Sequence, residues 1–210
     1  MLVAAGSRSI TAATSERISS RTARAVLFAA VIPSAVIGLL LDDWMDAHFY
    51  NYIVVAITLI LYGIAFLFVE RGDKTTKIRD VYAIDYRTAL LIGLFQCLSL
   101  IPGTSRSGST ILGAILIGVA RPAAAEFSFF LAIPTMLGAS ALKLLKYLME
   151  GMIPSSLEIG VLVTGCVVSL LVSLLVIRVL MDFVRKRSFA PFGIYRILLG
   201  TAVLAYFLLT

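Results

Sequence analysis

The sequence predicts an all-α, polytopic membrane protein in which a re-entrant helix–loop–helix forms part of an inverted-repeat architecture. First, 60% of its 210 residues are hydrophobic and the mean hydropathy is +1.00, a balance that ordinary soluble domains do not have. Second, several apolar runs reach or approach the length of about 20 residues that crosses a bilayer, and they are continuous rather than alternating as in a β-barrel. Third, the apolar stretch 88–120 is interrupted at its centre by Pro102, Gly103 and Gly108. We expect residues 1–210 to form a single integral membrane domain.

The first part of the chain is predicted to contain a basic segment and one helical hairpin. Residues 1–24 are rich in Ser, Thr, Ala and Arg and lack the apolar centre of a signal peptide. The hairpin, residues 25–69, consists of a first span and a span over 52–69. The first span covers 24–41, is slightly short, and is expected to extend further at its N-terminal end. Between these spans lies an acidic loop, which we interpret as an ordinary outer loop and which contains Asp42, Asp43, Asp46 and His48.

The remainder of the chain is predicted to contain the interrupted unit, a second hairpin and a last span. A charged loop over 70–87 carries Tyr82 and Tyr86, which can anchor at a membrane interface. The 88–120 unit follows. The second hairpin, 123–181, comprises a long helix over 123–148 that contains Pro134, a turn at 151–156 and a span over 157–181. A basic loop over 182–190 leads to the last span, 191–210.

The distribution of basic residues predicts how the 88–120 unit sits in the membrane. The net charge of +6 comes from basic residues in short loops and at segment ends, which indicates membrane orientation rather than nucleic-acid binding. If residues 1–24 are cytoplasmic, the 70–87 loop is cytoplasmic as well. A single crossing by 88–120 would then place Arg185, Lys186 and Arg187 outside, whereas a dip and return keeps them inside. Because each arm of the unit has only ten to fourteen residues, we expect a re-entrant unit rather than two full crossings.

A faint internal repeat agrees with an inverted-repeat architecture. Residues 28–34, Phe-Ala-Ala-Val-Ile-Pro-Ser, align with residues 129–135, Phe-Phe-Leu-Ala-Ile-Pro-Thr, at an offset of 101 residues. Each copy begins a helical hairpin, although two proline-bearing apolar helices can also resemble each other by chance. On the repeat interpretation the second hairpin follows a re-entrant unit and the first does not. We therefore expect the chain to begin partway through the first half of such an architecture.

Arg106 stands at the centre of the interruption, in the run Pro-Gly-Thr-Ser-Arg-Ser-Gly-Ser-Thr over residues 102–110. It is the only charged residue between positions 88 and 120, and a guanidinium in hydrocarbon costs roughly 2.5–3.5 kcal/mol. Its planar fork matches phosphate oxygens. Pro102 is expected to end the incoming half-helix, and Gly103 and Gly108 are expected to let the backbone turn and approach a ligand.

Hydroxyl and backbone groups around Arg106 complete a predicted anion site. Ser107, Ser109 or Thr110 is expected to cap the outgoing half-helix, which leaves free N–H groups and a positive dipole end at the loop. Ser105 and Thr110 can donate further hydrogen bonds. The predicted catalytic residues are Arg106, Ser105 and Thr110, and the predicted substrate-binding residues in the loop are Gly103, Thr104, Ser107, Gly108 and Ser109. The alternative is a hinge of small residues in which Arg106 makes a structural ion pair.

Two further polar residues are candidates for the same site. Gln96 lies on the incoming arm among apolar residues, either as a substrate-binding residue or as an interhelical contact. Glu126 lies in the first turns of the next helix. It either favours the helix start through the helix dipole, or pairs with Arg106, or helps to hold a cation as a metal ligand.

The segment 93–110, Gly-Leu-Phe-Gln-Cys-Leu-Ser-Leu-Ile-Pro-Gly-Thr-Ser-Arg-Ser-Gly-Ser-Thr, resembles the second signature of the bacterial undecaprenyl-diphosphate phosphatases, the bacitracin-resistance family. Residues 125–134 resemble the segment that follows this signature in the family. The resemblance implies an integral membrane enzyme that removes the terminal phosphate of undecaprenyl diphosphate with a divalent cation, Mg²⁺ or Ca²⁺. The family's essential arginine falls on Arg106, and its motif hydroxyls fall on Ser105, Ser107 and Thr110.

The resemblance also implies a cellular setting. A multi-pass protein of the bacterial inner (plasma) membrane would recycle the lipid carrier of cell-wall synthesis and confer bacitracin resistance. Its expected partners are a polyprenyl diphosphate lipid and the bilayer, without nucleic acid, and the assembly state is open between a single chain and a homodimer. The family's first signature, a Glu-rich segment followed by Pro and a Ser-Ser-x-Gly-His run, is absent from these residues. Two other functions therefore stay open: a truncated, catalytically incomplete relative, and a lipid or anion transporter with a re-entrant anion-binding loop.

Overall fold

The computed structural model of the chain describes residues 25–41, 44–45, 47–71, 76–151, 154–186 and 189–209. The predicted basic segment 1–24 and the acidic residues Asp42, Asp43 and Asp46 lie outside the described residues. Within the described part, the regular elements are helices, together with one isolated bridge. Four of these helices are long and apolar enough to cross a membrane. The predicted all-α polytopic class is therefore confirmed.

The helices follow the predicted apolar runs closely. A first helix covers Ala25–Leu41. It is followed by α2 (Tyr52–Arg71), η1 (Val81–Ala83), α3 (Tyr86–Cys97), η2 (Leu98–Leu100), α4 (Arg106–Ile117), α5 (Arg121–Met149), α6 (Ser156–Lys186) and α7 (Ala190–Leu209). The predicted loop over 182–190 is wrong in its first half, because α6 continues to Lys186. No proline or glycine stands between positions 166 and 186 to end the helix.

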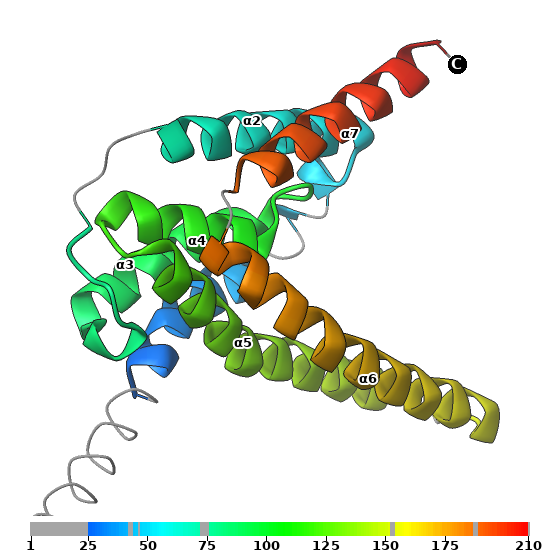
Figure 1. The fold of residues 1–210 in the computed structure, drawn as a ribbon. Coiled ribbons are helices and arrows are strands. Elements are labelled where there is room, and N and C mark those ends of the chain that lie inside the picture. Colours follow the sequence, from blue (N-terminus) through cyan, green and yellow to red (C-terminus); the bar gives the residue numbers. More distant parts are fainter. Residues whose placement is uncertain are drawn as a thin grey trace, which may run out of the picture.

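α2 and α7 lie side by side as an antiparallel pair (Figure 1). Tyr52 at the start of α2 stacks on Phe207 near the end of α7, with ring centroids 4.3 Å apart. Further along, a Cβ atom built on Gly63 would lie only 2.7 Å from the carbonyl oxygen of Gly193. Small residues at such contacts let helix backbones approach closely, which is how helices associate inside a bilayer. The pair therefore forms a firm support beside the shorter helices.

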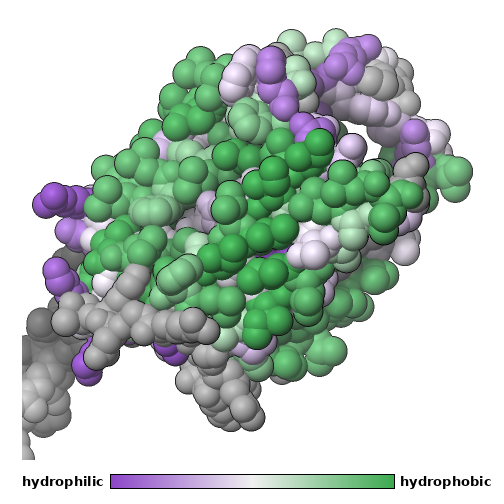
Figure 2. Space-filling model, turned by 90° about the horizontal axis from the view of Figure 1, so that it is seen from above, coloured by the Kyte–Doolittle hydropathy of each residue, from purple (hydrophilic) through white to green (hydrophobic). Residues whose placement is uncertain are grey.

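α5 and α6 form a long hairpin that extends away from the rest of the molecule (Figure 1). Within the apolar window of each helix, 11% of α5 and none of α6 is buried inside the protein. The face of the molecule in Figure 2 is likewise covered mostly by apolar side chains. A soluble monomer rarely exposes apolar surface on this scale. These surfaces are therefore suited to contact with lipid, and the protein is a multi-pass membrane protein.

α3 and α4 pack against each other and build the predicted re-entrant unit. Each has 12 residues, or about 18 Å of helix at 1.5 Å per residue, which is well short of the ~30 Å hydrocarbon core. The two ends of the unit are joined, since Ile78 and Val119 form an isolated parallel bridge and Ala120 N donates to Ile78 O at 2.7 Å. Because entrance and exit lie side by side, the chain goes in and returns, which is the geometry that a re-entrant unit requires.

Candidate functional site

The loop between α3 and α4 is formed by a proline and a glycine. α3 ends at Cys97, and η2 extends it as a tighter helix to Leu100, so that the incoming helix stops before Pro102 as predicted. Gly103 has a φ of +85°, a conformation that L side chains rarely adopt. A Cβ atom at this position would also lie 2.6 Å from the carbonyl oxygen of Val55 in α2. Glycine is thus required twice at this position, by the turn and by the close approach to α2.

Ser105 caps the start of α4. Its backbone is extended, with φ −68° and ψ 128°, and its Oγ accepts a hydrogen bond from Gly108 N at 3.1 Å. The expectation that Ser107, Ser109 or Thr110 would be the cap is therefore wrong. α4 begins directly after the Pro-Gly turn, so these residues already lie within the helix. Among the described residues, the backbone N–H groups of Arg106 and Ser107 have no acceptor, as expected for the first turn of a helix.

Gly108 does not provide the backbone turn that the sequence suggested. It lies in the first turn of α4, and within the described residues only Gly103, Gly118 and Gly151 have positive φ. A Cβ atom on Gly108 would lie 3.1 Å from Ser105 Cβ and 3.4 Å from Phe66 Cε2. The absence of a side chain at Gly108 therefore allows close packing of the cap and α2, rather than a turn in the backbone.

Arg106 is the first residue of α4, and its side chain is partly buried. Within the described part of the chain, its guanidinium makes no hydrogen bond or ion pair. Glu126, in α5, is also partly buried and does not pair with it. The alternative of a structural ion pair for Arg106 therefore finds no support among these residues. An unpaired guanidinium beside two free N–H groups is an arrangement that suits an anionic oxygen.

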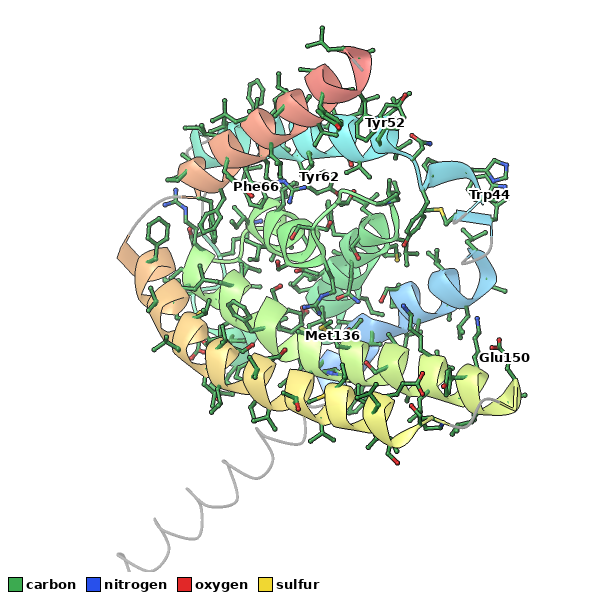
Figure 3. The ribbon with its side chains drawn as sticks, turned by 90° about the vertical axis from the view of Figure 1, so that its right-hand side faces the viewer. Trp44, Tyr52, Tyr62, Phe66, Met136 and Glu150 are labelled. Carbon is green, nitrogen blue, oxygen red and sulfur yellow. The ribbon has the colours of Figure 1, made fainter. Side chains whose placement is uncertain are left out.

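Two of the predicted hydroxyls are committed to helix packing. Thr110 is 1% exposed, and its Oγ1 lies 2.6 Å from the Oγ of Ser128 in α5. Ser109 is fully buried, and its Oγ lies 3.3 Å from Tyr62 Oη in α2 and 3.1 Å from Ser105 O. Figure 3 shows Tyr62 on the side of α2 that faces the re-entrant unit. The structure thus gives Thr110 and Ser109 a packing role, whereas Ser107 is partly exposed next to Arg106.

Gln96 connects the two halves of the internal repeat. It is 1% exposed, and its Nε2 donates to Ser34 Oγ at 2.6 Å and to Thr135 Oγ1 at 3.4 Å. Ser34 and Thr135 are equivalent positions, because each directly follows the proline of its repeat copy, Pro33 or Pro134. Residues 101 positions apart therefore meet at one side chain. This contact supports the repeat interpretation over chance similarity.

Three buried side-chain atoms of the described residues have no hydrogen-bond partner, namely Gln96 Oε1, Thr104 Oγ1 and Arg196 Nε. All three lie at the re-entrant unit, because Arg196 Nη2 donates to Gly103 O at 2.7 Å. Folded proteins leave few such atoms unpaired, and each one points to a bound water, ion or ligand or to stored strain. Two of these atoms, on Thr104 and Arg196, lie at the loop before α4, so the loop has unsatisfied polar groups that a polar ligand or water could pair.

Arg196 and its neighbours are the site residues that sequence reasoning missed. Arg196 lies in α7, Tyr62 and Thr58 lie in α2, and Thr58 Oγ1 lies 2.8 Å from Pro102 O. A signal for Arg196 was present in the sequence, since a charged residue inside an apolar span is by default a functional candidate. Tyr62 and Thr58 gave no such signal, because a polar residue in a span is common at helix contacts.

The described residues do not form a metal site by themselves. Within them, no three His, Cys, Asp or Glu side chains are grouped so as to hold a metal ion. Glu126 offers a single carboxylate in the second turn of α5. A hard cation such as Mg²⁺ takes one or two carboxylates together with oxygens of a phosphate substrate, so Glu126 alone does not make a preformed site.

Comparisons with known proteins place this geometry in a family context. Residues 2–202 match the protein family described as bacitracin resistance protein BacA. The chain is 57% identical over 180 residues to undecaprenyl-diphosphatase 1 of Clostridioides difficile. The matched residues make up 86% of this chain and 65% of that relative. It is 54% identical over 182 residues to undecaprenyl-diphosphatase of Lactiplantibacillus plantarum. This match makes up 86% of this chain and 66% of the relative. The chain thus spans slightly less than two thirds of the length of these relatives.

Proposed function

The chain belongs to the bacitracin resistance protein family BacA, and we propose that it is a membrane phosphatase that acts on undecaprenyl diphosphate. Water adds to the terminal phosphorus and the bond from that phosphorus to the bridging oxygen breaks. The products are inorganic phosphate and undecaprenyl phosphate, the lipid carrier of cell-wall synthesis. Removal of the diphosphate form also accounts for the bacitracin resistance in the family name. The relatives named undecaprenyl-diphosphatase, at 54–57% identity, support this substrate.

The observation that carries this proposal is the guanidinium of Arg106 at the start of α4, which has no partner among the residues that the structure describes. The guanidinium of Arg106 and the backbone N–H groups of Arg106 and Ser107 bind the diphosphate oxygens. They stabilise the negative charge that moves onto the bridging oxygen as its bond to the terminal phosphorus breaks. Ser105 holds the start of α4 in this position through its cap on Gly108 N. The Ser107 hydroxyl lies 3.2 Å from Ser105 Oγ, and it would turn from that contact to donate to a phosphate oxygen. The lipid tail would lie between the apolar helices.

We further propose that a divalent cation, Mg²⁺ or Ca²⁺, takes part, with Glu126 as one of its ligands. Such a cation would neutralise diphosphate charge when bound. The described residues do not complete its coordination, so no step is derived through it. Phosphate release that survives an excess of EDTA would remove the cation from the proposal, and release restored by Mg²⁺ or Ca²⁺ would support it.

The decisive experiment measures phosphate release from undecaprenyl diphosphate by the purified chain in detergent. Arg106→Ala is expected to lower the rate by about 100-fold or more, as for loss of a donor to a developing negative charge, and to leave membrane insertion intact. Arg106→Lys should recover only part of the rate, because an ammonium cannot form the bidentate contact. Arg79→Ala, at an exposed loop position, is the matched control for loss of one positive charge. Full activity in Arg106→Ala would overturn the role of Arg106.

The same assay separates the rival functions. A catalytically incomplete relative releases no phosphate alone but does so when mixed with a separately expressed N-terminal fragment of a longer relative, such as the clostridial protein of which this chain spans 65%. A transporter releases none in either condition. We place the protein in the bacterial inner membrane, which fractionation tests. The assembly state stays open between a single chain and a homodimer, and cross-linking in membranes distinguishes the two.

A further inference from the structure

Arg196 is the only charged residue of α7, a helix that is otherwise apolar and long enough to cross a membrane. Its side chain is partly buried. A charge in this setting is costly and is retained where it has a partner or a function. Within the described residues, the partners of Arg196 are the carbonyl oxygen of Gly103, at 2.7 Å from Nη2, and the ring of Tyr62, whose centroid lies 5.7 Å from Cζ.

The contact between Arg196 and Gly103 is a charge-assisted hydrogen bond to the centre of the re-entrant loop. Bonds of this kind are roughly twice as strong as bonds between neutral groups. A second helix holds the preceding carbonyl, because Thr58 Oγ1 in α2 lies 2.8 Å from Pro102 O. The Thr58 hydroxyl is shared, since Val54 O is equally close at 2.8 Å. Arg196 is therefore the stronger of the two attachments.

The two attachments originate from one rigid support. α2 and α7 meet through Gly63 and Gly193, where a Cβ atom on either residue would lie within 2.8 Å of the other's carbonyl oxygen. The two helices therefore have little room to slide or separate. A loop held by both of them is fixed relative to the whole pair, rather than to one mobile side chain.

The position of Gly103 determines where the anion site points. Only two residues separate Gly103 from Arg106, and Gly103 is locked at a φ of +85°. Rotation of the peptide after Gly103 would turn the start of α4, together with its free N–H groups and the Arg106 side chain. We propose that Arg196 is a positioning residue, which holds the Gly103 carbonyl so that Arg106 and the start of α4 face the diphosphate. This inference rests on the proposed phosphatase function.

The test combines a structural readout with a kinetic one, on the full chain in detergent. The variants are Arg196→Met, which keeps much of the length of the side chain without its charge, and Arg196→Lys, which keeps a donor. Leu198→Ala is the matched control, because Leu198 is exposed on the same helix. Hydrogen–deuterium exchange reports on the loop through the amides of Thr104, Gly108 and Ser109, which donate to Ile101 O, Ser105 Oγ and Ser105 O. Phosphate release from undecaprenyl diphosphate reports kcat and KM.

We expect Arg196→Met to speed exchange of the loop amides by about ten-fold, as for loss of one hydrogen bond to a charged group. It should lower kcat by a similar factor with little change in KM, and Arg196→Lys should lie between Met and wild type. A residue with only a structural role would instead lower the folded fraction and leave kcat per folded molecule unchanged. Unchanged loop exchange or unchanged kcat in folded Arg196→Met overturns the proposal. If the wild-type chain releases no phosphate, the proposed function fails, and loop exchange still decides whether Arg196 holds the loop.

Discussion

The hydrogen bond between Thr110 and Ser128 predicts that removing one partner destabilises the protein more than removing the other. Both residues are almost completely buried, and their hydroxyl oxygens are 2.6 Å apart between α4 and α5. Thr110→Val leaves the Ser128 hydroxyl without a partner among the described residues, and an unsatisfied buried hydroxyl costs about 1–3 kcal/mol. Ser128→Ala leaves Thr110 Oγ1 within 3.1 Å of both Arg106 O and Ser107 O. Its cost should therefore be that of an average interhelical bond in a membrane, about 0.6 kcal/mol.

The free energy of unfolding, from SDS titration in mixed micelles, measures these costs. We expect Thr110→Val to be the more destabilising variant, and the double variant to cost less than the sum of the two because the residues share one contact. Phosphate release per folded molecule should stay close to wild type in both single variants. Equal destabilisation by the two single changes would refute the reasoning from hydrogen-bond partners. A large loss of kcat in a fully stable Thr110→Val would refute the packing role of Thr110 and restore its predicted catalytic role.

Two further predictions concern packing and pH. Gly93→Ala should destabilise the protein by about 1–3 kcal/mol in the same titration, because its Cβ atom would collide with the carbonyl oxygen of Ala30 in the first helix. Gly138→Ala, which meets nothing within 4 Å, should be neutral or stabilising, and equal effects of the two changes would contradict this account of the Gly93 contact. Hydrogen bonds from Thr88 lower the pKa of Asp85, the N-cap of α3, below its ordinary value of 3.8. The stabilisation by Asp85 is therefore fully present above that value and is lost as pH falls through the lowered pKa. The unfolding midpoint of wild type should fall as pH is lowered from 6, and it should fall less in Asp85→Asn. Identical dependence on pH in the two proteins would contradict a stabilising role of the ionised Asp85.

The spans could be predicted from the sequence because apolar length is the dominant signal in a bilayer. The predicted spans 24–41 and 52–69 correspond to the helices Ala25–Leu41 and Tyr52–Arg71 within two residues at each end. The 88–120 unit was predicted from its arm lengths and from loop charge, and the bridge between Ile78 and Val119 agrees with that topology. The end of α6 was misplaced, since charged residues suggested a loop although nothing in the sequence ends a helix there.

The details of the site could be predicted only in part. The run of hydroxyls around Arg106 indicated an anion site, but any of several neighbours could have capped α4. Ser105 is the cap because α4 begins at Arg106, and the position of that start depends on how Gly103 packs against Val55 in α2. Such contacts join residues nearly 50 positions apart and leave no local pattern. Arg196 was overlooked for a different reason, because the hydropathy of the last span outweighs one charge.

The join between Ile78 and Val119 also bears on how the polypeptide is inserted during biogenesis. The two ends of the α3–α4 unit lie together, on the same side of the membrane. No polar connection therefore has to cross to the opposite side when the unit is inserted. The neighbouring spans can be threaded first, and this unit can then fold down from water into the space that they enclose. Its arginine would enter last, already shielded by protein, and would avoid a solitary passage through the lipid interior.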